Sequence, residues 1–175
     1  MKIKISSSNL NQKPLDWKRN YINIKKSIEK SIKKDVKILC LPELSITGYG
    51  CQDLFLNKWV IDNAKLELIK IKNLCNNIAI FIGIPIYYNN KIYNAGCFIK
   101  DKKIKGFFIK SNLPNDGIHY EKRWFEPWNL GEKKEIFFNG KKIPIGTIQY
   151  EYNKDLTIGF EICRDSWDKE RPLKY

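Results

Sequence analysis

The sequence is poor in the residues that build metal sites, disulfide frameworks and membrane spans. It contains one histidine, and its five cysteines (Cys40, Cys51, Cys75, Cys97 and Cys163) are scattered without a Cys-x-x-Cys pair. This pattern indicates reduced thiols and predicts no metal site. No apolar run approaches the roughly 20 residues that cross a bilayer, and the N-terminal residues lack the apolar core of a signal peptide. We therefore expect a cytoplasmic protein with no membrane partner.

Arginine is also scarce. All but four of the 32 basic residues are lysine, and the formal net charge is +13. A basic chain can bind nucleic acid, but the guanidinium fork of arginine reads phosphates and guanines best. The lysines are spread along a chain equally rich in Ile and Asn, whose codons are also A- and T-rich. We interpret the lysines as solvated surface and expect no nucleic-acid partner.

Two common catalytic signatures are missing. The glycines form neither a G-x-G-x-x-G pattern nor a P-loop, so no ATP site is visible. His119 is the single candidate base for Ser-His-Asp chemistry, and no nucleophile elbow accompanies it. We interpret His119 as a loop residue.

The periodic segments predict one domain over 175 residues, with an α/β layer and a mixed sheet. We expect helices over residues 14–33, capped by Asp16, and 59–76. We expect strands over residues 2–7, 36–41, 78–84, 104–109, 135–138, 143–150 and 156–160, with tight turns at 89–90, 101–103 and 139–140. Cys40 and Cys97 lie in apolar runs and are expected in the core.

The segment 111–132 is too long for an idle connector, because long ordered loops in compact domains usually serve a function. It carries the aromatic residues Trp124, Phe125 and Trp128. We expect them to pin the loop to the core, and the alternative is that they line a cleft.

Three apolar runs, over residues 36–41, 104–109 and 156–160, each lead to one reactive side chain: Glu43, Lys110 and Cys163. A strand end is a rigid place from which to aim a side chain into a cleft. A thiol needs a base to become a nucleophile, and an amide under attack needs a cation or N–H groups to hold the developing negative charge. The three residues therefore predict one catalytic site.

The segments LPELSITGYGCQDLF around Glu43, KSNLPNDGIHYEKRWFEPW from Lys110 and GFEICRDSW around Cys163 resemble the nitrilase, or carbon-nitrogen hydrolase, superfamily. The triad of that superfamily is Glu, Lys and Cys in this order. The motifs are most similar to the glutaminase domain of glutamine-dependent NAD synthetases, and the likeness extends to about Trp167. It implies a nitrilase-like α-β-β-α sandwich whose C-terminal part we expect to be missing from residues 1–175. The synthetase domain is expected to be absent.

The resemblance implies that the chain hydrolyses the side-chain amide of glutamine through a thioester on Cys163. Glu43 would be the general base, and Lys110 with the backbone N–H of Arg164 would hold the oxyanion. The family usually has an acidic residue where this chain has Arg164, which bears on recognition of the ammonium group of glutamine. The ammonia would serve the synthesis of NAD from deamido-NAD.

The resemblance also assigns Glu121 to steadying the lysine and the substrate, and Arg164 and Trp167 to substrate binding. The glutaminase step would use no cofactor, whereas ATP and Mg²⁺ would serve the absent synthetase domain. That domain, or a downstream segment, is the expected partner, and the complete protein is expected to be a homo-oligomer. The short chain is expected to be a poor enzyme, or an inactive or split fragment.

Two other hypotheses stay open. Another amidase of the superfamily would keep the triad without needing the loop NDGIHYEKRWFEPW, and assays on glutamine and simple amides would separate the two activities. A non-enzymatic basic binding module would need none of the three reactive residues.

Overall fold

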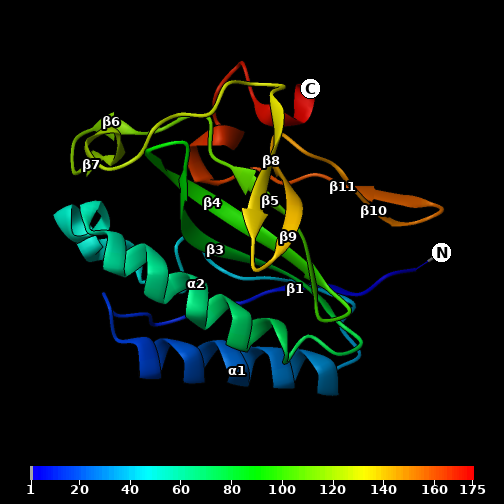
Figure 1. The fold of residues 1–175 in the computed structure, drawn as a ribbon. Coiled ribbons are helices and arrows are strands. Elements are labelled where there is room, and N and C mark those ends of the chain that lie inside the picture. Colours follow the sequence, from blue (N-terminus) through cyan, green and yellow to red (C-terminus); the bar gives the residue numbers. More distant parts are fainter. Residues whose placement is uncertain (1) are drawn as a thin grey trace.

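The computed structural model describes residues 2–175 and is built on a seven-stranded mixed sheet (Figure 1). The strand order is β1-β2-β3-β4-β5-β9-β8. The strands are β1 (Ile5–Ser7), β2 (Ile38–Cys40), β3 (Ala79–Tyr88), β4 (Lys91–Lys100), β5 (Lys103–Ile109), β8 (Lys133–Phe138) and β9 (Lys141–Gly146). The predicted α/β class is confirmed.

Strands that follow one another in the chain are paired in most of the sheet. β1, β2 and β3 are parallel, and β3, β4 and β5 continue as two antiparallel hairpins. The β8–β9 hairpin then joins β5 through a parallel β5–β9 pair. The turns at residues 89–90, 101–102 and 139–140 all have positive φ at both central residues. Such turns match the right-handed twist of paired strands, so the three predicted turns are confirmed.

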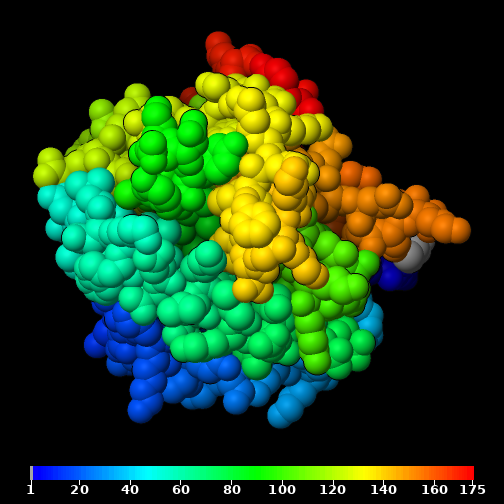
Figure 2. Space-filling model, viewed as in Figure 1, coloured from blue at the N-terminus to red at the C-terminus, as the bar shows by residue number. Residues whose placement is uncertain are grey.

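Two helices, α1 (Trp17–Lys33) and α2 (Lys58–Lys72), pack against each other and cover one face of the sheet (Figure 1). Ile24 and Ile28 of α1 are fully buried. Asp16 accepts a hydrogen bond from the backbone N–H of Arg19 at 3.1 Å, so the predicted cap is confirmed. Figure 2 shows the β8–β9 hairpin, in yellow and orange, lying against α2. Among residues 2–175, no helix has the length and apolar character needed to cross a membrane.

An aromatic cluster covers the other face of the sheet. The rings of Phe81 and Phe160 stack with their centroids 3.7 Å apart, and Phe98, Phe108 and Tyr150 pack around them. Because Phe81, Phe98 and Phe108 come from adjacent strands, this cluster attaches the chain after β9 to the sheet.

Several expected elements differ in extent: the strand over 2–7 begins at Ile5, that over 78–84 extends to Tyr88, and the helix over 59–76 ends at Lys72. Two expected strands differ more. The pattern over residues 143–150 predicts one strand, but β9 ends at Gly146, where φ is +121° and a Cβ would lie 2.3 Å from the carbonyl oxygen of Glu132. The run 156–160 predicts a buried strand of the main sheet. Instead, β11 (Leu156–Ile158) pairs with β10 (Tyr150–Asn153) in a separate, partly exposed hairpin. Alternation around exposed Thr157 fits this half-buried position.

The predicted core position is right for Cys97, which is fully buried, but wrong for Cys40, which is exposed. Side chains alternate across a strand. Leu39 of β2 points into the core beneath the helices, and Cys40 therefore points to the opposite face.

The segment between β5 and β8 contains short elements: β6 (Asn115–Asp116), β7 (His119–Tyr120) and the 3-10 helix η2 (Glu121–Arg123). Trp124, Phe125 and Trp128 are buried, as expected of residues that pin the loop to the core. The hairpin of β6 and β7 is exposed and includes His119. The aromatic residues thereby fix the segment that carries Glu121.

Candidate active site

The backbone around Glu43 is shaped by a close approach to β3. Leu44 has a φ of +48°, so the chain turns sharply directly after Glu43. A Cβ at Gly83 would lie 2.1 Å from the backbone nitrogen of Leu44 and 2.6 Å from the carbonyl oxygen of Pro42. Only glycine at position 83 lets the turn lie this close to the strand. The Glu43 carboxylate is thus held at the end of β2, with its side chain 17% exposed.

Lys110 follows β5 and is fully buried. Its Nζ donates to Glu43 Oε1 at 2.6 Å and to both carboxylate oxygens of Glu121 at 2.9 Å. Burial by itself lowers the pKa of the Lys110 ammonium, but the two carboxylates outweigh it and the pKa lies above its usual value. Lys110 is therefore a cation at neutral pH, held between two acids.

Glu121 is also fully buried, at the start of η2. Besides Lys110, it accepts a hydrogen bond from the Tyr49 hydroxyl at 2.6 Å. Burial and then this contact raise the pKa of Tyr49 far above its usual range, so the phenol stays a donor. Tyr49 belongs to the 3-10 segment η1 (Tyr49–Leu56) and connects that segment to the acid that steadies Lys110.

Cys163 begins the short 3-10 helix η3 (Cys163–Ser166) and has a φ of +47°, a strained conformation for a residue other than glycine. Cys163 and Glu43 line the same cavity of about 210 Å³, which lies at the end of β2 and over the middle of β3 and β4. Burial raises the pKa of the thiol, the Glu43 carboxylate raises it further, and Lys110 lowers it in part. The net shift is upward, so the resting thiol keeps its proton and needs a base.

Asp165 joins the nucleophile turn to the residues after Lys110. Its buried carboxylate accepts hydrogen bonds from the backbone N–H groups of Ser111, Asn112 and Ile162 at 2.7–3.2 Å. Burial raises the pKa of Asp165 to about 6, despite these three donors. Cys163 lies outside the main sheet, and this carboxylate links its turn to the segment that follows Lys110.

Arg164 and Trp167 lie at the surface beside Cys163. The Arg164 guanidinium is 3.3 Å from Asp168 and 3.8 Å from Asp116, and Trp167 is 82% exposed. Neither is among the described residues that line the cavity shared by Cys163 and Glu43. The structure thus brings Glu43, Lys110 and Glu121 into contact and leaves Arg164 and Trp167 outside the cavity.

Three residues in or beside this network were not predicted from the sequence: Tyr49, Asp165 and Asn94, whose side-chain amide donates to Glu43 Oε1 at 2.7 Å. Each shows only a weak signal, a polar residue inside or next to an otherwise apolar segment. Asn94 interrupts the apolar strand YNAGCFI, and Asp165 follows the motif cysteine by two residues.

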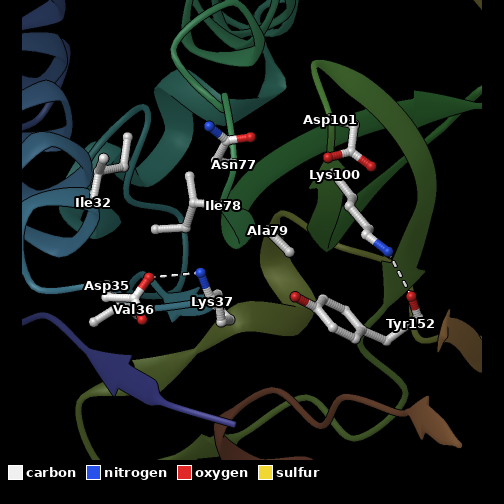
Figure 3. A pocket seen from close by; sticks show the side chains of 10 residues that line it. All are labelled: Ile32, Asp35, Val36, Lys37, Asn77, Ile78, Ala79, Lys100, Asp101 and Tyr152. Carbon is white, nitrogen blue, oxygen red and sulfur yellow. Dashed lines mark hydrogen bonds and ion pairs between the residues drawn. The ribbon is translucent and has the colours of Figure 1, made fainter.

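A larger cavity of about 420 Å³ lies at the opposite ends of β2 and β3 (Figure 3). Two of its lysines already have partners, since Lys37 contacts Asp35 at 2.6 Å and Lys100 donates to the carbonyl oxygen of Tyr152 at 2.5 Å. None of the described residues lining it is a cysteine or histidine. The smaller cavity beside Cys163 is therefore the candidate active site.

Residues 4–174 match the model of the family described as carbon-nitrogen hydrolase. The chain belongs to the carbon-nitrogen hydrolase family.

Proteins with similar sequences show which members of the family this chain resembles. The chain is 29% identical to the glutamine-dependent NAD(+) synthetase of Mus musculus, over 98% of this chain and 25% of the relative. It is 34% identical to that of Oryza sativa subsp. indica, over 97% of this chain and 24% of the relative. It thus spans about a quarter of the length of these curated relatives. The resemblance expected from the three motifs is confirmed.

Solved structures agree with the sequence relatives. A glutamine-dependent NAD(+) synthetase from Cytophaga hutchinsonii matches with a TM-score of 0.90 and 42% identity, over 93% of this chain and 28% of that chain. An amidase from Nesterenkonia sp. matches with a TM-score of 0.63 and 18% identity, over 81% of this chain and 54% of that chain. The second likeness shows a shared fold.

Proposed function

We propose that this carbon-nitrogen hydrolase domain hydrolyses the side-chain amide of glutamine through a thioester on Cys163. The observation that carries the proposal is the buried contact chain Glu43–Lys110–Glu121 beside a cysteine that shares a cavity with Glu43. It supplies a base, a cation and a nucleophile at one place. The similar proteins named glutamine-dependent NAD(+) synthetases support glutamine as the amide.

In the first half of the proposed reaction, Glu43 takes the proton of the Cys163 thiol while the sulfur attacks the amide carbon of glutamine. Lys110 has three N–H donors. Glu43 takes one and the two oxygens of Glu121 share another, so the third can be donated to the developing oxyanion. The backbone N–H of Arg164, which lies next to the thiol, would be the second donor.

Collapse of the tetrahedral intermediate passes the proton from Glu43 to the amide nitrogen, and ammonia leaves. A water molecule that gives its proton to Glu43 then attacks the thioester carbon. Cleavage of the carbon–sulfur bond releases glutamate, and the thiol regains its proton from Glu43. This sequence uses Glu43 alternately as base and acid and assigns no step to a metal or organic cofactor.

The ammonia would supply the amidation of deamido-NAD in a synthetase domain, the partner that we propose from the names of the relatives. ATP and Mg²⁺ would belong to that second reaction. The proposal also includes a homo-oligomeric complete protein located in the cytoplasm.

A second candidate is the hydrolysis of another amide. It is favoured by the position of the Arg164 and Trp167 side chains outside the cavity, since neither side chain then contacts a small amide bound beside Cys163. In that case the carboxylates and N–H groups of the cavity would act on a substrate that lacks the α-amino and α-carboxyl groups of glutamine.

Measuring the carboxylic acid released from glutamine, asparagine and propionamide would separate the two candidate functions. Cys163→Ala and Glu43→Gln are the controls. We expect release from glutamine that both substitutions abolish. Turnover of propionamide but not glutamine would favour the second candidate, and activity that survives Cys163→Ala would contradict the thioester mechanism.

A further inference from the structure

Asn94 occupies an unusual position for an asparagine. It lies within β4 and is fully buried. Its side-chain Nδ2 donates to Glu43 Oε1 at 2.7 Å, and its backbone carbonyl oxygen accepts the N–H of Lys110 at 2.9 Å. One residue thus contacts both the proposed base and the proposed cation.

The fold does not require an amide here. Asparagine is a poor strand former, and burying its amide is costly unless both ends are hydrogen-bonded. The Oδ1 atom of Asn94 is buried without a hydrogen-bond partner among residues 2–175. A buried, half-satisfied polar group in a strand is a departure from folding rules of the kind found at functional sites.

The two oxygens of the Glu43 carboxylate differ in their contacts. Oε1 accepts from both Asn94 and Lys110. Oε2 makes no hydrogen bond within the described part of the chain, and Glu43 lines the cavity that holds Cys163. The oxygen without a partner is therefore the one available for a thiol proton.

We infer that Asn94 is a positioning residue for the base: it holds Oε1 of Glu43 and so presents Oε2 to Cys163. This inference deepens the proposed function and rests on Glu43 acting as the base. Donation from Asn94 fixes the orientation of the carboxylate and so leaves Oε2 directed away from this contact. The other charged or titratable groups around Glu43 are Lys110, Glu121, Tyr49 and Cys163.

The test measures alkylation of Cys163 by iodoacetamide from pH 5 to 9, followed by peptide mass spectrometry. Asn94→Leu removes the donor with little change of volume, and it should slow alkylation at pH 7 about tenfold, since a hydrogen bond to a charged group is lost. Asn94→Asp places a second carboxylate beside Glu43. The two acids would share one proton, so the acidic limb of the profile should move up by about one pH unit or more.

Asn20→Asp is the matched control. Asn20 is also buried, but its amide donates to the backbone oxygens of Lys13 and Ile46, away from Glu43. This variant should lose thermal stability and keep the wild-type alkylation profile. Circular dichroism establishes that each variant is folded before labelling.

The unaltered protein provides a measurement that does not depend on any variant folding. The NMR signals of the Asn94 side-chain amide should shift with pH together with the carboxyl carbon of Glu43. Alkylation profiles of both Asn94 variants equal to wild type, or an Asn94 amide that does not follow the titration of Glu43, would overturn the inference. Alkylation requires no glutamine, so a domain inactive on glutamine that still shows the Asn94 effect would contradict the proposed substrate alone.

Discussion

Replacing Glu121 by Gln should destabilise the fold far more than the loss of a surface carboxylate. Lys110 and Glu121 are both fully buried, and the Lys110 ammonium is balanced by Glu121 on one side and Glu43 on the other. Glutamine keeps the shape and one acceptor oxygen for the Tyr49 hydroxyl. It removes one of the two negative charges that hold the buried cation.

The expected magnitude follows from burial. Breaking a buried ion pair by removing one partner costs about 3–5 kcal/mol. Because Glu43 still pairs with Lys110, we expect about 3 kcal/mol, which lowers the melting temperature of a domain of this size by about 6–12 °C. Thermal unfolding followed by circular dichroism at pH 7 measures this change.

The matched control is Glu126→Gln. Glu126 pairs with Lys91 at 3.3 Å, but the side chains are 48% and 53% exposed, so its loss should cost well under about 1 kcal/mol. In the double variant Lys110→Met, Glu121→Gln, the two changes should cost less than the sum of the separate changes, because no buried cation is left to balance. Equal melting temperatures for Glu121→Gln and Glu126→Gln would refute the reasoning.

Two further predictions concern the turns that carry Glu43 and Cys163. The folded pKa of Asp165, about 6, lies above the ordinary value of 3.8, so this residue contributes stability that is present below about pH 3.8 and is lost as pH rises through 6. The free energy of unfolding of Asp165→Asn, measured with urea, should therefore increase relative to that of the wild type between pH 4 and 7. Parallel pH profiles of the two proteins would contradict this. Gly83→Ala should cost about 2–3 kcal/mol because its Cβ would overlap the Glu43 turn. Gly50→Ala, where the nearest atom is 3.4 Å from the added Cβ, is the control, and equal losses of stability would count against the close-approach argument.

The elements with strong local signals could be predicted from the sequence. The amphipathic stripe of α1, its Asp16 cap and the three tight turns are determined by residues close in the chain. Glu43, Lys110 and Cys163 are candidate site residues from the sequence alone, because apolar runs and the family resemblance both mark them.

The rest depends on contacts between distant segments. The alternation around Thr157 indicates a half-buried strand, but nothing in the run 156–160 identifies its partner as β10 instead of a strand of the main sheet. The roles of Asn94 and Asp165 depend on partners 51 and 53–54 residues away in the chain. The apolar run around Cys40 predicts a core position, although period-two alternation decides which face of the sheet it occupies.

The charges around Lys110 explain why a protonated thiol suits this site. Glu43, Lys110 and Glu121 together carry one net negative charge, so a resting thiolate would add a second one in a partly buried place. In the proposed reaction, the thiol proton moves to Glu43 during attack, and the negative charge passes from the carboxylate to the substrate oxygen. Lys110 contacts the first and would donate to the second. The total charge of the group would be unchanged through this step, so the site would stabilise the oxyanion without burying any additional charge.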